Sequence, residues 1–456
     1  MTAPVAGGAD AAAPGGVTSA VVVGAGLAGL TAASGLAERG VEVTVMEARE
    51  RVGGRTHGLR VSPTGWVDAG AAYLGDRHTE LLALMAELDL KTTPTTMLGA
   101  SRFALGAEHA TRDGRFPPLN AVALGDMFEL LAELTDAVRP EAPWLTPDAE
   151  RLDTTTAAEW AEQNLTHPDA RLFFPLFLGE MMAADPADVS VLHMAFYLRS
   201  GGGIRYLNAF EGGAQQDRIA GGAHQACERL AARLGDRVRL GEPAVAVHQD
   251  GAGVTVRTAL GEYRADVVVV ALPPLLAQAL EYAPALPAPR AGRRTARGCA
   301  VKVNLVYPEP LWRRHGLSGW SVNAEGPLLS TVDDSPSDDG VGVLTGFVTG
   351  AEAHRYAALD PEQQRTAAVE QAARLFPMLP APIAFHVTDW VNDPYSQGCY
   401  AALFGPGDWL RHGPSLTAPH GRVHWAGTET STAFFGLMEG AIRSGDRVVA
   451  EILGRP

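Results

Sequence analysis

The residues of this sequence that are best suited to chemistry begin with three glycines, Gly24, Gly26 and Gly29, which follow an apolar run at 20–23. In a strand–turn–helix unit the first glycine permits a tight turn, the second lets the backbone approach a pyrophosphate, and the third lets the helix pack closely on the strand. The phosphate charge then faces the N-terminus of the helix. Glycines also gather in ordinary turns, so the neighbouring elements decide between these interpretations.

An acidic residue follows where a dinucleotide requires one. Glu47 lies 18 residues beyond Gly29, at the end of a second apolar run at 41–46, and a carboxylate in this place meets ribose hydroxyl groups. It repels a 2′-phosphate, which favours FAD or NAD over NADP. The next segment, 51–55, allows two interpretations. Arg55 can bind phosphate oxygens with two N–H groups of its guanidinium, or the segment can be a solvated loop. We favour the phosphate interpretation because the segment follows the acid-tipped strand.

The pattern along the rest of the chain predicts an α/β fold. Strand and helix signals alternate up to about Asp89, helical patterns dominate from Arg102 to Gly203, and strand signals then return, with a hairpin around Asp250. The unbroken β-branched run at 266–272 suits a buried parallel strand. Helices are predicted at 80–90, 121–138, 154–163, 170–184, 189–199, 361–375 and 438–453, and further strands at 238–240, 244–248, 253–258, 300–306, 341–347 and 383–388 and from 423. A nucleotide-binding fold in three separated pieces, with a substrate domain inserted between them, accounts for this order.

Composition limits the possible functions. At 456 residues, with 46% hydrophobic residues, the chain exceeds one ordinary core, so we expect two domains. A net charge of −15 argues against nucleic acid and against anionic membrane surfaces as partners. The three cysteines imply no disulfide framework and fit a reducing cytoplasm, and the histidines show no metal-ligand spacing. No run reaches the length of a membrane helix, and residues 1–18 resemble a disordered tail rather than a signal peptide.

A cluster of acids at Asp333, Asp334, Asp338 and Asp339 allows two interpretations. It could line the mouth of a cavity and attract a diamine. Runs of like charge are more often solvated loops, and we predict a loop here.

Several motifs together resemble the flavin monoamine oxidase family, from about Ser19 to the C-terminus. They are Gly24–Leu30, Glu47–Arg49, Arg51–Thr56, Asp68–Gly70, Lys302, Gly398–Tyr400 and Trp425–Thr430, and they occur in the family order. The resemblance implies FAD rather than NAD, and oxidation of an amine to an imine or aldehyde with reduction of dioxygen to hydrogen peroxide. It also implies an α/β fold with a Rossmann-like FAD-binding domain of the GR2 type, assembled from discontinuous segments, and an inserted α+β substrate-binding domain. We expect the FAD domain at 19–92, 220–290 and 393–456, and the substrate domain at 93–219 and 291–392.

Lys302 and Cys399 are the residues to which the resemblance gives the most distinct chemistry. Lys302 interrupts an apolar strand pattern, and a charge that faces a core is costly unless it has a task. In the family the matching lysine holds a water against the reactive flavin nitrogen and assists reoxidation; a strand-edge lysine that reaches solvent is the alternative. Cys399 matches the position that forms a thioether to the flavin, although a small buried hydrophobe is the common fate of a free cysteine.

The resemblance also assigns the walls of the amine site. Tyr400 is expected beside the flavin as one wall of an aromatic cage, but the second cage tyrosine of many relatives is replaced here by Leu437. Phe434 or Phe435 could restore an aromatic surface, or both could belong to the core. The expected substrate pocket comprises Gln215, with Gln216 as an alternative in a shifted register, and Leu207, Phe435 and Leu437. The expected cofactor-binding residues are Gly24, Gly26, Gly29, Glu47, Arg49, Arg55, Gly70, Tyr73, Val245, Trp390, Cys399, Gly427, Glu429, Leu437 and Met438.

Amine chemistry sets a physical requirement on such a pocket. A protonated amine has no lone pair to release as its C–H bond breaks, and with a pKa of ~10 its deprotonation at neutral pH costs roughly 4 kcal/mol. Desolvation lowers that cost, so we expect apolar walls and few acids. The most favoured substrate is a primary arylalkyl or aliphatic amine. The alternative substrates are an amino acid, a polyamine or an N-methylated amine, and the alternative to an enzyme is a non-catalytic flavin-bound module. An amino-acid substrate would need an arginine, such as Arg205, to bind its carboxylate. The sequence leaves open whether the protein is a monomer or a homodimer.

Overall fold

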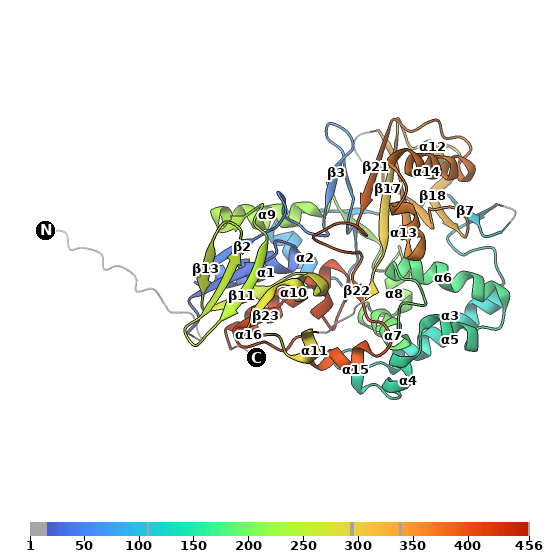
Figure 1. Cartoon of the computed structure of the whole chain (residues 1–456). Helices are drawn as coiled ribbons and strands as arrows, with labels where there is room; N and C mark the ends of the chain where they lie inside the picture. The colour runs from blue at the N-terminus through green and yellow to red at the C-terminus, as the bar shows by residue number, and fades with distance from the viewer. Residues whose placement is uncertain (1–15, 107–108, 292–295, 337–339, 455–456) are drawn as a thin grey trace.

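The computed structural model describes residues 16–454 apart from 107–108, 292–295 and 337–339. A parallel five-stranded sheet, in the order β10-β2-β1-β14-β23, lies on the left of Figure 1. Its strands are β1 (Ser19–Val23), β2 (Glu42–Met46), β10 (Val238–Arg239), β14 (Val267–Val270) and β23 (Val423–Trp425). Three separated stretches of the chain therefore meet in one sheet.

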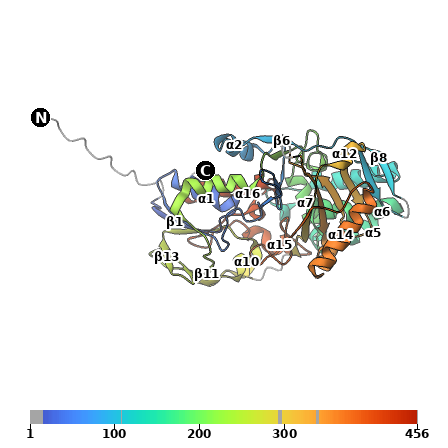
Figure 2. The same cartoon turned by 90° about the horizontal axis from the view of Figure 1, so that it is seen from above.

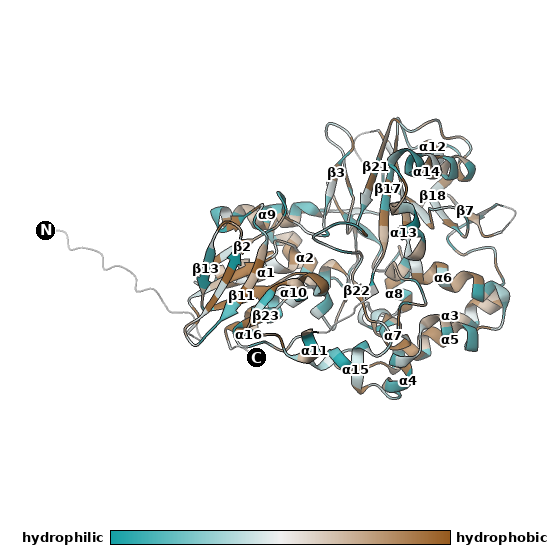
Figure 3. Ribbon diagram, in the orientation of Figure 1, coloured by the Kyte–Doolittle hydropathy of each residue, from teal (hydrophilic) through white to brown (hydrophobic). Residues whose placement is uncertain are grey.

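Both faces of this sheet are covered, because alternate side chains of each strand enter different cores. In β14, Val267 and Val269 pack with helices α1 (Leu27–Ala37), α9 (His224–Leu234) and α16 (Met438–Ile452). Val268 and Val270 face a four-stranded sheet, in the order β13 (Glu262–Ala265), β12 (Val254–Thr258), β11 (Ala244–Gln249) and β15 (Glu281–Ala283). The buried parallel strand predicted at 266–272 is thus confirmed. Figure 3 shows α1 as mostly apolar, as expected for a helix that is buried on nearly all sides.

Two glycines let the backbones of this layer approach closely. A Cβ atom on Gly29 would lie 2.0 Å from the carbonyl oxygen of Gly24, which is the close packing of helix on turn that the sequence predicts. A Cβ on Gly445 in α16 would lie 2.8 Å from the carbonyl oxygen of Ala28 in α1. The contact between α1 and α16 therefore depends on a position without a side chain.

The second large element is a seven-stranded sheet in the order β21-β17-β20-β19-β18-β7-β8, at the upper right of Figure 1. Its strands are β7 (Ala100–Ala104), β8 (Ala110–Asp113), β17 (Ala300–Tyr307), β18 (Leu317–Asn323), β19 (Ser330–Asp333), β20 (Gly342–Thr349) and β21 (Ala384–Asp389). Helices α12 (Leu311–Arg314), α13 (Gly350–Ala357) and α14 (Pro361–Leu375) accompany it. Trp312, Tyr356 and Phe376 are buried in the shared core.

Helices from the middle of the chain form a group below this sheet in Figure 1 and share a third core. They are α3 (Ala121–Ala137), α4 (Ala149–Thr154), α5 (Ala157–Asn164), α6 (Pro168–Met182), α7 (Val191–Ser200) and α8 (Ile204–Asn208). Seen from above in Figure 2, these helices lie at the opposite end of the molecule from β13. No helix of the described residues is long and apolar enough to cross a bilayer.

The remaining elements are short and connect these layers. They are β3 (Gly58–Arg60), β4 (Trp66–Asp68), β5 (Tyr73–Leu74), α2 (Thr79–Glu87), β6 (Thr92–Pro94), β9 (Asp217–Ile219), β11 (Ala244–Gln249), β12 (Val254–Thr258), β13 (Glu262–Ala265), α10 (Pro274–Ala279), β15 (Glu281–Ala283), α11 (Ala288–Ala291), β16 (Ala296–Arg297), β22 (Ala402–Leu403) and α15 (Asp408–His412). Strand β9 pairs with both β5 and β6, so residues 217–219 join the first nucleotide-binding segment. The domain boundaries that we expect from the sequence stay a prediction.

The sequence patterns miss four strands of the seven-stranded sheet. β7 and β8 fall at or within the stretch in which helical signals dominate, and β18 and β19 precede the strand predicted at 341–347. β18 carries Gly319 at φ +78° and polar residues at 318, 321 and 323, although every one of its residues is buried. A buried polar strand lacks the apolar signal by which strands are recognised.

The prediction of a solvated loop at the acidic cluster is wrong for two of its four residues. Asp333 and Asp334 are each 1% exposed. Asp333 accepts a hydrogen bond of 2.8 Å from the indole N–H of Trp312, and Asp334 forms an ion pair with Arg218. Asp338 and Asp339 lie outside the described residues. Charge density alone therefore mispredicts this segment, because each buried acid has its own donor.

The N-terminal tail predicted at 1–18 falls mostly outside the described residues, which begin at Gly16. Val17 packs against the core of the five-stranded sheet, and the amide of Thr18 donates a hydrogen bond of 2.8 Å to Asp266. The tail prediction is therefore wrong for these two residues, which extend the anchorage of β1.

We expect Gly445→Ala to destabilise the protein by about 1–3 kcal/mol, because the new methyl group meets the backbone of α1. Gly125→Ala is the matched control: this glycine is exposed in α3, and a Cβ added there would have no other atom within 4 Å. It should gain about 0.5–1 kcal/mol from helix propensity. Urea unfolding of both variants measures the two changes, and equal effects would contradict the importance of the α1–α16 contact.

Candidate active site

A cavity of about 500 Å³ runs from the glycine turn after β1 to the seven-stranded sheet. Gly24, Gly26 and Glu47 line one end, and Trp320 and Phe347 line the other. The predicted residues that line it are Gly24, Gly26, Glu47, Arg49, Arg55, Gly70, Tyr73, Leu207, Gln215, Val245, Lys302, Cys399, Tyr400, Gly427, Leu437 and Met438. The fold thus brings most of the predicted site together.

The nucleotide end of the cavity is shaped by glycine backbone. Gly24 has φ +105°, and a Cβ there would lie 2.8 Å from the carbonyl oxygen of Ala271. A Cβ on Gly26 would have nothing within 4 Å, so the backbone there faces open space. Gly26 is also the N-cap of α1, where no side chain caps the helix. The first N–H groups of α1 consequently face a cradle that suits phosphate oxygens.

Glu47 organises the edge of this cradle. Its carboxylate is buried and accepts hydrogen bonds from the backbone amides of Ala25, at 2.9 Å, and Arg49, at 3.0 Å. The Arg49 side chain forms an ion pair with Asp393 and donates a hydrogen bond of 2.8 Å to Ser396. Segments from both ends of the chain therefore meet beside the carboxylate that is predicted to bind ribose.

Arg55 lines the cavity, but its guanidinium group binds a carboxylate of the protein rather than the predicted phosphate. Its two terminal nitrogens donate to Glu429 at 2.7 and 3.0 Å, and one also donates to the carbonyl oxygen of Tyr400 at 2.8 Å. Burial alone would lower the pKa of Arg55 and raise that of Glu429; their mutual attraction outweighs burial and shifts both pKa values the other way. Glu429 does not itself line the cavity, so it acts on the site through Arg55.

Lys302 lies on the cavity wall where β17 of the seven-stranded sheet meets the segment at 68–70. It is 4% exposed on β17, and its ammonium donates to the carbonyl oxygens of Asp68 and, at 3.1 Å, Gly70. It also lies 5.3 Å from the ring centre of Phe347. An ammonium has three donors, so one remains for a group in the cavity. The alternative of a strand-edge lysine that reaches solvent is therefore wrong.

Cys399 and Tyr400 lie side by side on the cavity wall and are joined by a cis peptide bond. Burial raises the pKa of the Cys399 thiol to about 11, against the opposing effect of Arg55 and Lys302. Burial likewise holds the pKa of the Tyr400 phenol well above its ordinary value. Trp390 packs with Cys399 and donates a hydrogen bond of 2.9 Å to the carbonyl oxygen of Ala69, but it does not line the cavity. The sequence analysis places Trp390 in direct contact with the cofactor, but in the structure it lies behind Cys399 instead.

The substrate walls differ from the prediction at Phe435. This residue is fully buried between His193, Phe196 and Phe404 and does not line the cavity, so its assignment to the substrate pocket is wrong. Phe434 also packs inside, against His78. The core interpretation holds for both because the turn directs their rings into the helical core. Gly436 and Leu437 are the residues of this turn that line the cavity.

Gln215 is the glutamine that lines the cavity. Its amide donates a hydrogen bond of 3.1 Å to the carbonyl oxygen of Leu207, which lines the same wall. Gln216 instead accepts a hydrogen bond of 2.8 Å from the amide of Gly212 and does not line the cavity. Arg205 is exposed and also does not line it.

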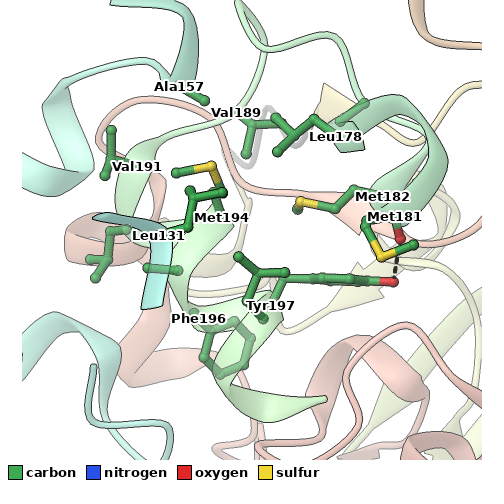
Figure 4. Close-up of a cluster of buried hydrophobic side chains, with 14 of the residues drawn as sticks. Leu131, Ala157, Leu178, Met181, Met182, Val189, Val191, Met194, Phe196 and Tyr197 are labelled. Atoms are coloured by element: carbon green, nitrogen blue, oxygen red, sulfur yellow. Dashed lines mark hydrogen bonds between the residues drawn. The ribbon is translucent and has the colours of Figure 1, made fainter. Parts of the chain in front are cut away.

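The sequence analysis misses several residues at the substrate end: Arg115, Glu180, Tyr197, Phe210 and Trp320. Figure 4 shows Tyr197 with its hydroxyl group directed at Met181, to whose carbonyl oxygen it donates a bond of 2.7 Å. Burial raises the pKa of Glu180 to about 7, against the opposing effect of Arg115. Glu180 is a single acid at this end of the cavity, in keeping with the expectation of few acids. The available signal was a single acid in the apolar run 172–182, the same kind of signal that singles out Lys302.

Comparison with known proteins agrees with this geometry. The family model described as "Flavin containing amine oxidoreductase" matches residues 27–453. The chain belongs to this family. Amine oxidase [flavin-containing] A of Canis lupus familiaris is 33% identical over 445 residues, which cover 95% of this chain and 84% of that protein.

Solved structures of this family have the same fold. Putrescine oxidase, bound to putrescine, superposes with a TM-score of 0.91 at 30% identity and covers 96% of this chain and 99% of its own. Cyclohexylamine oxidase from Brevibacterium oxydans gives a TM-score of 0.90 at 31% identity, with 96% and 99% covered. As a flavin-containing amine oxidoreductase, this protein is a flavoprotein that uses FAD to oxidise an amine, an oxidase acting on CH–NH₂.

We expect Arg55→Met to release FAD and to destabilise the fold by about 3–5 kcal/mol at pH 7, because Glu429 is left as a buried charge without its cation. The double variant Arg55→Met/Glu429→Leu is the control and should recover much of this loss. Flavin absorbance and urea unfolding measure the two effects.

The loss should also depend on pH. In the parent, the lowered pKa of Glu429 contributes stability above its unfolded value of about 4.5, and this stability is lost as the pH falls through the lowered pKa. In Arg55→Met the unpaired carboxyl is cheapest to bury when protonated, so the difference from the parent grows as the pH rises from 4.5 to 8. A difference that stays constant over this range would contradict the ion-pair account.

Proposed function

We propose that this protein oxidises a primary arylalkyl or aliphatic amine to the imine, which water converts to the aldehyde, and passes the electrons to dioxygen to give hydrogen peroxide. The observation that carries the proposal is the position of Lys302. Its buried ammonium lies on the wall of the same cavity that holds the Gly24–Gly26 turn and Tyr400, and it keeps one donor for that cavity.

The residues of the cavity fit FAD. The Gly26 cradle at the N-terminus of α1 suits the pyrophosphate, and Glu47 suits a ribose. Val245 is a hydrophobic side chain that is 46% exposed in the protein yet lines this cavity, as an adenine contact would require. When bound, FAD accepts the hydride that leaves the carbon next to the amine nitrogen.

The N-terminus of α16 supports charge at the other end of the cofactor. Leu437 is its N-cap and Met438 its first residue; both line the cavity, and no side chain caps the helix. The positive end of the helix dipole therefore points into the site, where it stabilises negative charge.

The amine meets walls that disfavour its charged form. Tyr73, Leu207, Phe210 and Tyr400 present apolar surface, and the high pKa of Tyr400 keeps its phenol neutral. Desolvation of an ammonium lowers its pKa, so the substrate gives up its proton more easily here than in water. Tyr400 orients the resulting lone pair, and Lys302 holds a water or dioxygen with its remaining donor.

Anaerobic reduction and peroxide release test this function. With a panel of arylalkyl and aliphatic amines, we expect the yellow colour to bleach without oxygen, and air to restore it with one peroxide per aldehyde. Lys302→Met should still bleach, but its reoxidation by dioxygen should slow by at least about 100-fold, or ~3 kcal/mol of activation free energy. Protein that binds FAD and is bleached by no amine would contradict the proposal, and an unchanged reoxidation rate would remove Lys302 from it.

We further propose that Cys399 carries FAD as a thioether. Its thiol is buried on the cavity wall, with Arg55 and Lys302 near enough to favour the thiolate against burial. The new sulfur–carbon bond replaces the S–H bond and one C–H bond of a flavin methyl group. Dioxygen takes up the two electrons and two protons and becomes hydrogen peroxide.

Acid precipitation checks the linkage. The parent should give a yellow pellet and Cys399→Ala a yellow supernatant. Cys299→Ala is the matched control, because Cys299 is also buried but does not line the cavity. With the thiol pKa near 11, attachment of FAD to apoprotein should accelerate about tenfold per pH unit between 7 and 9, following the thiolate fraction. A colourless pellet from the parent would contradict the thioether.

A further inference from the structure

We propose that Glu180 and Arg115 form a polar subsite that binds a hydroxyl group at the far end of the substrate, so that a ring-hydroxylated arylalkylamine is preferred over its unsubstituted analogue. This proposal rests on the amine oxidation proposed above and names the class of amine.

Glu180 is available to a ligand. It lies on α6 near the end of the helix and lines the cavity, together with Ser330, whose hydroxyl opposes the effect of burial on the pKa of the acid. No basic group of the described residues lies within 4 Å of its carboxylate, so Arg115 attracts it across a gap rather than in an ion pair. A buried carboxylate is costly unless its oxygens are well supplied with donors. Two oxygens accept more than one hydrogen bond, and a group in the cavity can supply a further one.

Arg115 is held in place by its surroundings. Its guanidinium carbon lies 4.2 Å from the ring centre of Phe210 and 5.2 Å from that of Trp320. One terminal nitrogen donates a hydrogen bond of 2.6 Å to the carbonyl oxygen of Asn208. These contacts fix the plane of the guanidinium and use one of its five N–H donors in that bond. The side chain lines the cavity, so a ligand can accept from it.

Aromatic side chains around this pair suit a flat ring. Tyr73 and Phe210 meet edge to face at 6.0 Å, and Phe210 and Trp320 at 5.4 Å, and all three line the cavity with Phe347. Edge and face contacts of this kind favour an aromatic ligand over an aliphatic chain of equal length. A substrate with its amine at Tyr400 would then present the opposite edge of its ring to the polar pair.

The charges on the walls favour a neutral group at that position. Arg115 and Glu180 line this end of the cavity. A second ammonium would meet the like charge of Arg115, and a carboxylate would meet Glu180. A hydroxyl group can donate to Glu180 and accept from Arg115 without adding charge. Because burial brings the pKa of Glu180 to about 7, the acid is present in both forms near neutral pH, and a hydroxyl can bond to either form.

Substrate pairs test the subsite. We expect 4-hydroxyphenylethylamine to exceed 2-phenylethylamine in kcat/KM for anaerobic flavin reduction by about 10–100-fold, because the analogue without the hydroxyl group leaves the polar groups of the subsite unpaired. The ratio should change by less than about threefold between pH 6 and 8. 1,4-Diaminobutane is the third substrate, because binding of a second ammonium requires ionised Glu180 and strengthens as the pH rises through 7.

Two variants separate the possible roles of the acid. Glu180→Leu should reduce the hydroxyl preference to less than about threefold, whereas Glu180→Gln keeps a hydrogen-bonding group of similar size and should retain most of it. Flavin content and the thermal midpoint of each variant show whether the fold is intact. If Glu180→Leu does not fold, loss of preference in Arg115→Met with retained preference in Glu180→Gln supports the proposal.

Two results would overturn the inference. One is an equal kcat/KM for the two arylalkylamines in the parent, and the other is a preferred diamine whose advantage disappears in Glu180→Gln. Both leave the amine oxidation intact, because flavin is still reduced. Failure of every amine to reduce the flavin would instead contradict the proposed function itself.

Discussion

A buried cation at the junction of two sheets is the constraint on which the rest of this site depends. Lys302 belongs to β17 of the seven-stranded sheet, but the carbonyl oxygens that receive its ammonium belong to Asp68 and Gly70, in the first nucleotide-binding segment. An ammonium away from water needs such partners, since its desolvation costs several kcal/mol. The two parts of the molecule are therefore held in one register by the residue that we propose to assist the reaction.

The Arg55–Glu429 pair is a second buried charged contact between distant segments of the chain at this cavity. The guanidinium comes from the loop after β2, and the carboxylate from the segment after β23; the pair also binds the backbone at Tyr400 and Ala402. The cavity is thus bounded by polar contacts between distant segments, while each segment has its own apolar core. Burial stabilises the layers, and a few charged contacts place them relative to one another.

The parts of this architecture that could be predicted are those with a local pattern. The glycine turn at 24–29, the β-branched run of β14 and the amphipathic helices α3, α14 and α16 follow from spacing alone, and their observed bounds lie close to the predicted ones. The family resemblance placed Lys302, Cys399 and Tyr400 correctly on one cavity. The sequence itself marks only Lys302, a charge that interrupts an apolar strand pattern; Cys399 and Tyr400 were placed by the resemblance.

The parts that could not be predicted depend on contacts between distant residues. Phe435 enters the core because His193 and Phe404 leave space for it, and Asp334 is buried because Arg218 reaches it from β9. Arg115 follows β8 in a segment whose sequence shows no pattern, and only the fold brings it opposite Glu180. Partners of this kind are separated by tens to hundreds of residues, beyond the range of any periodicity.

The order of strands in the parallel sheet has a consequence for how the protein is made. β1 is paired on one side with β2, which follows within a few turns of chain, and on the other side with β14, about 250 residues later; β23 and α16 complete the layer near residue 450. The glycine turn therefore stays incompletely enclosed until almost the whole polypeptide has been synthesised. A complete site for the flavin nucleotide forms only once β23 and α16 have been synthesised, so a chain that ends before them lacks part of its enclosure.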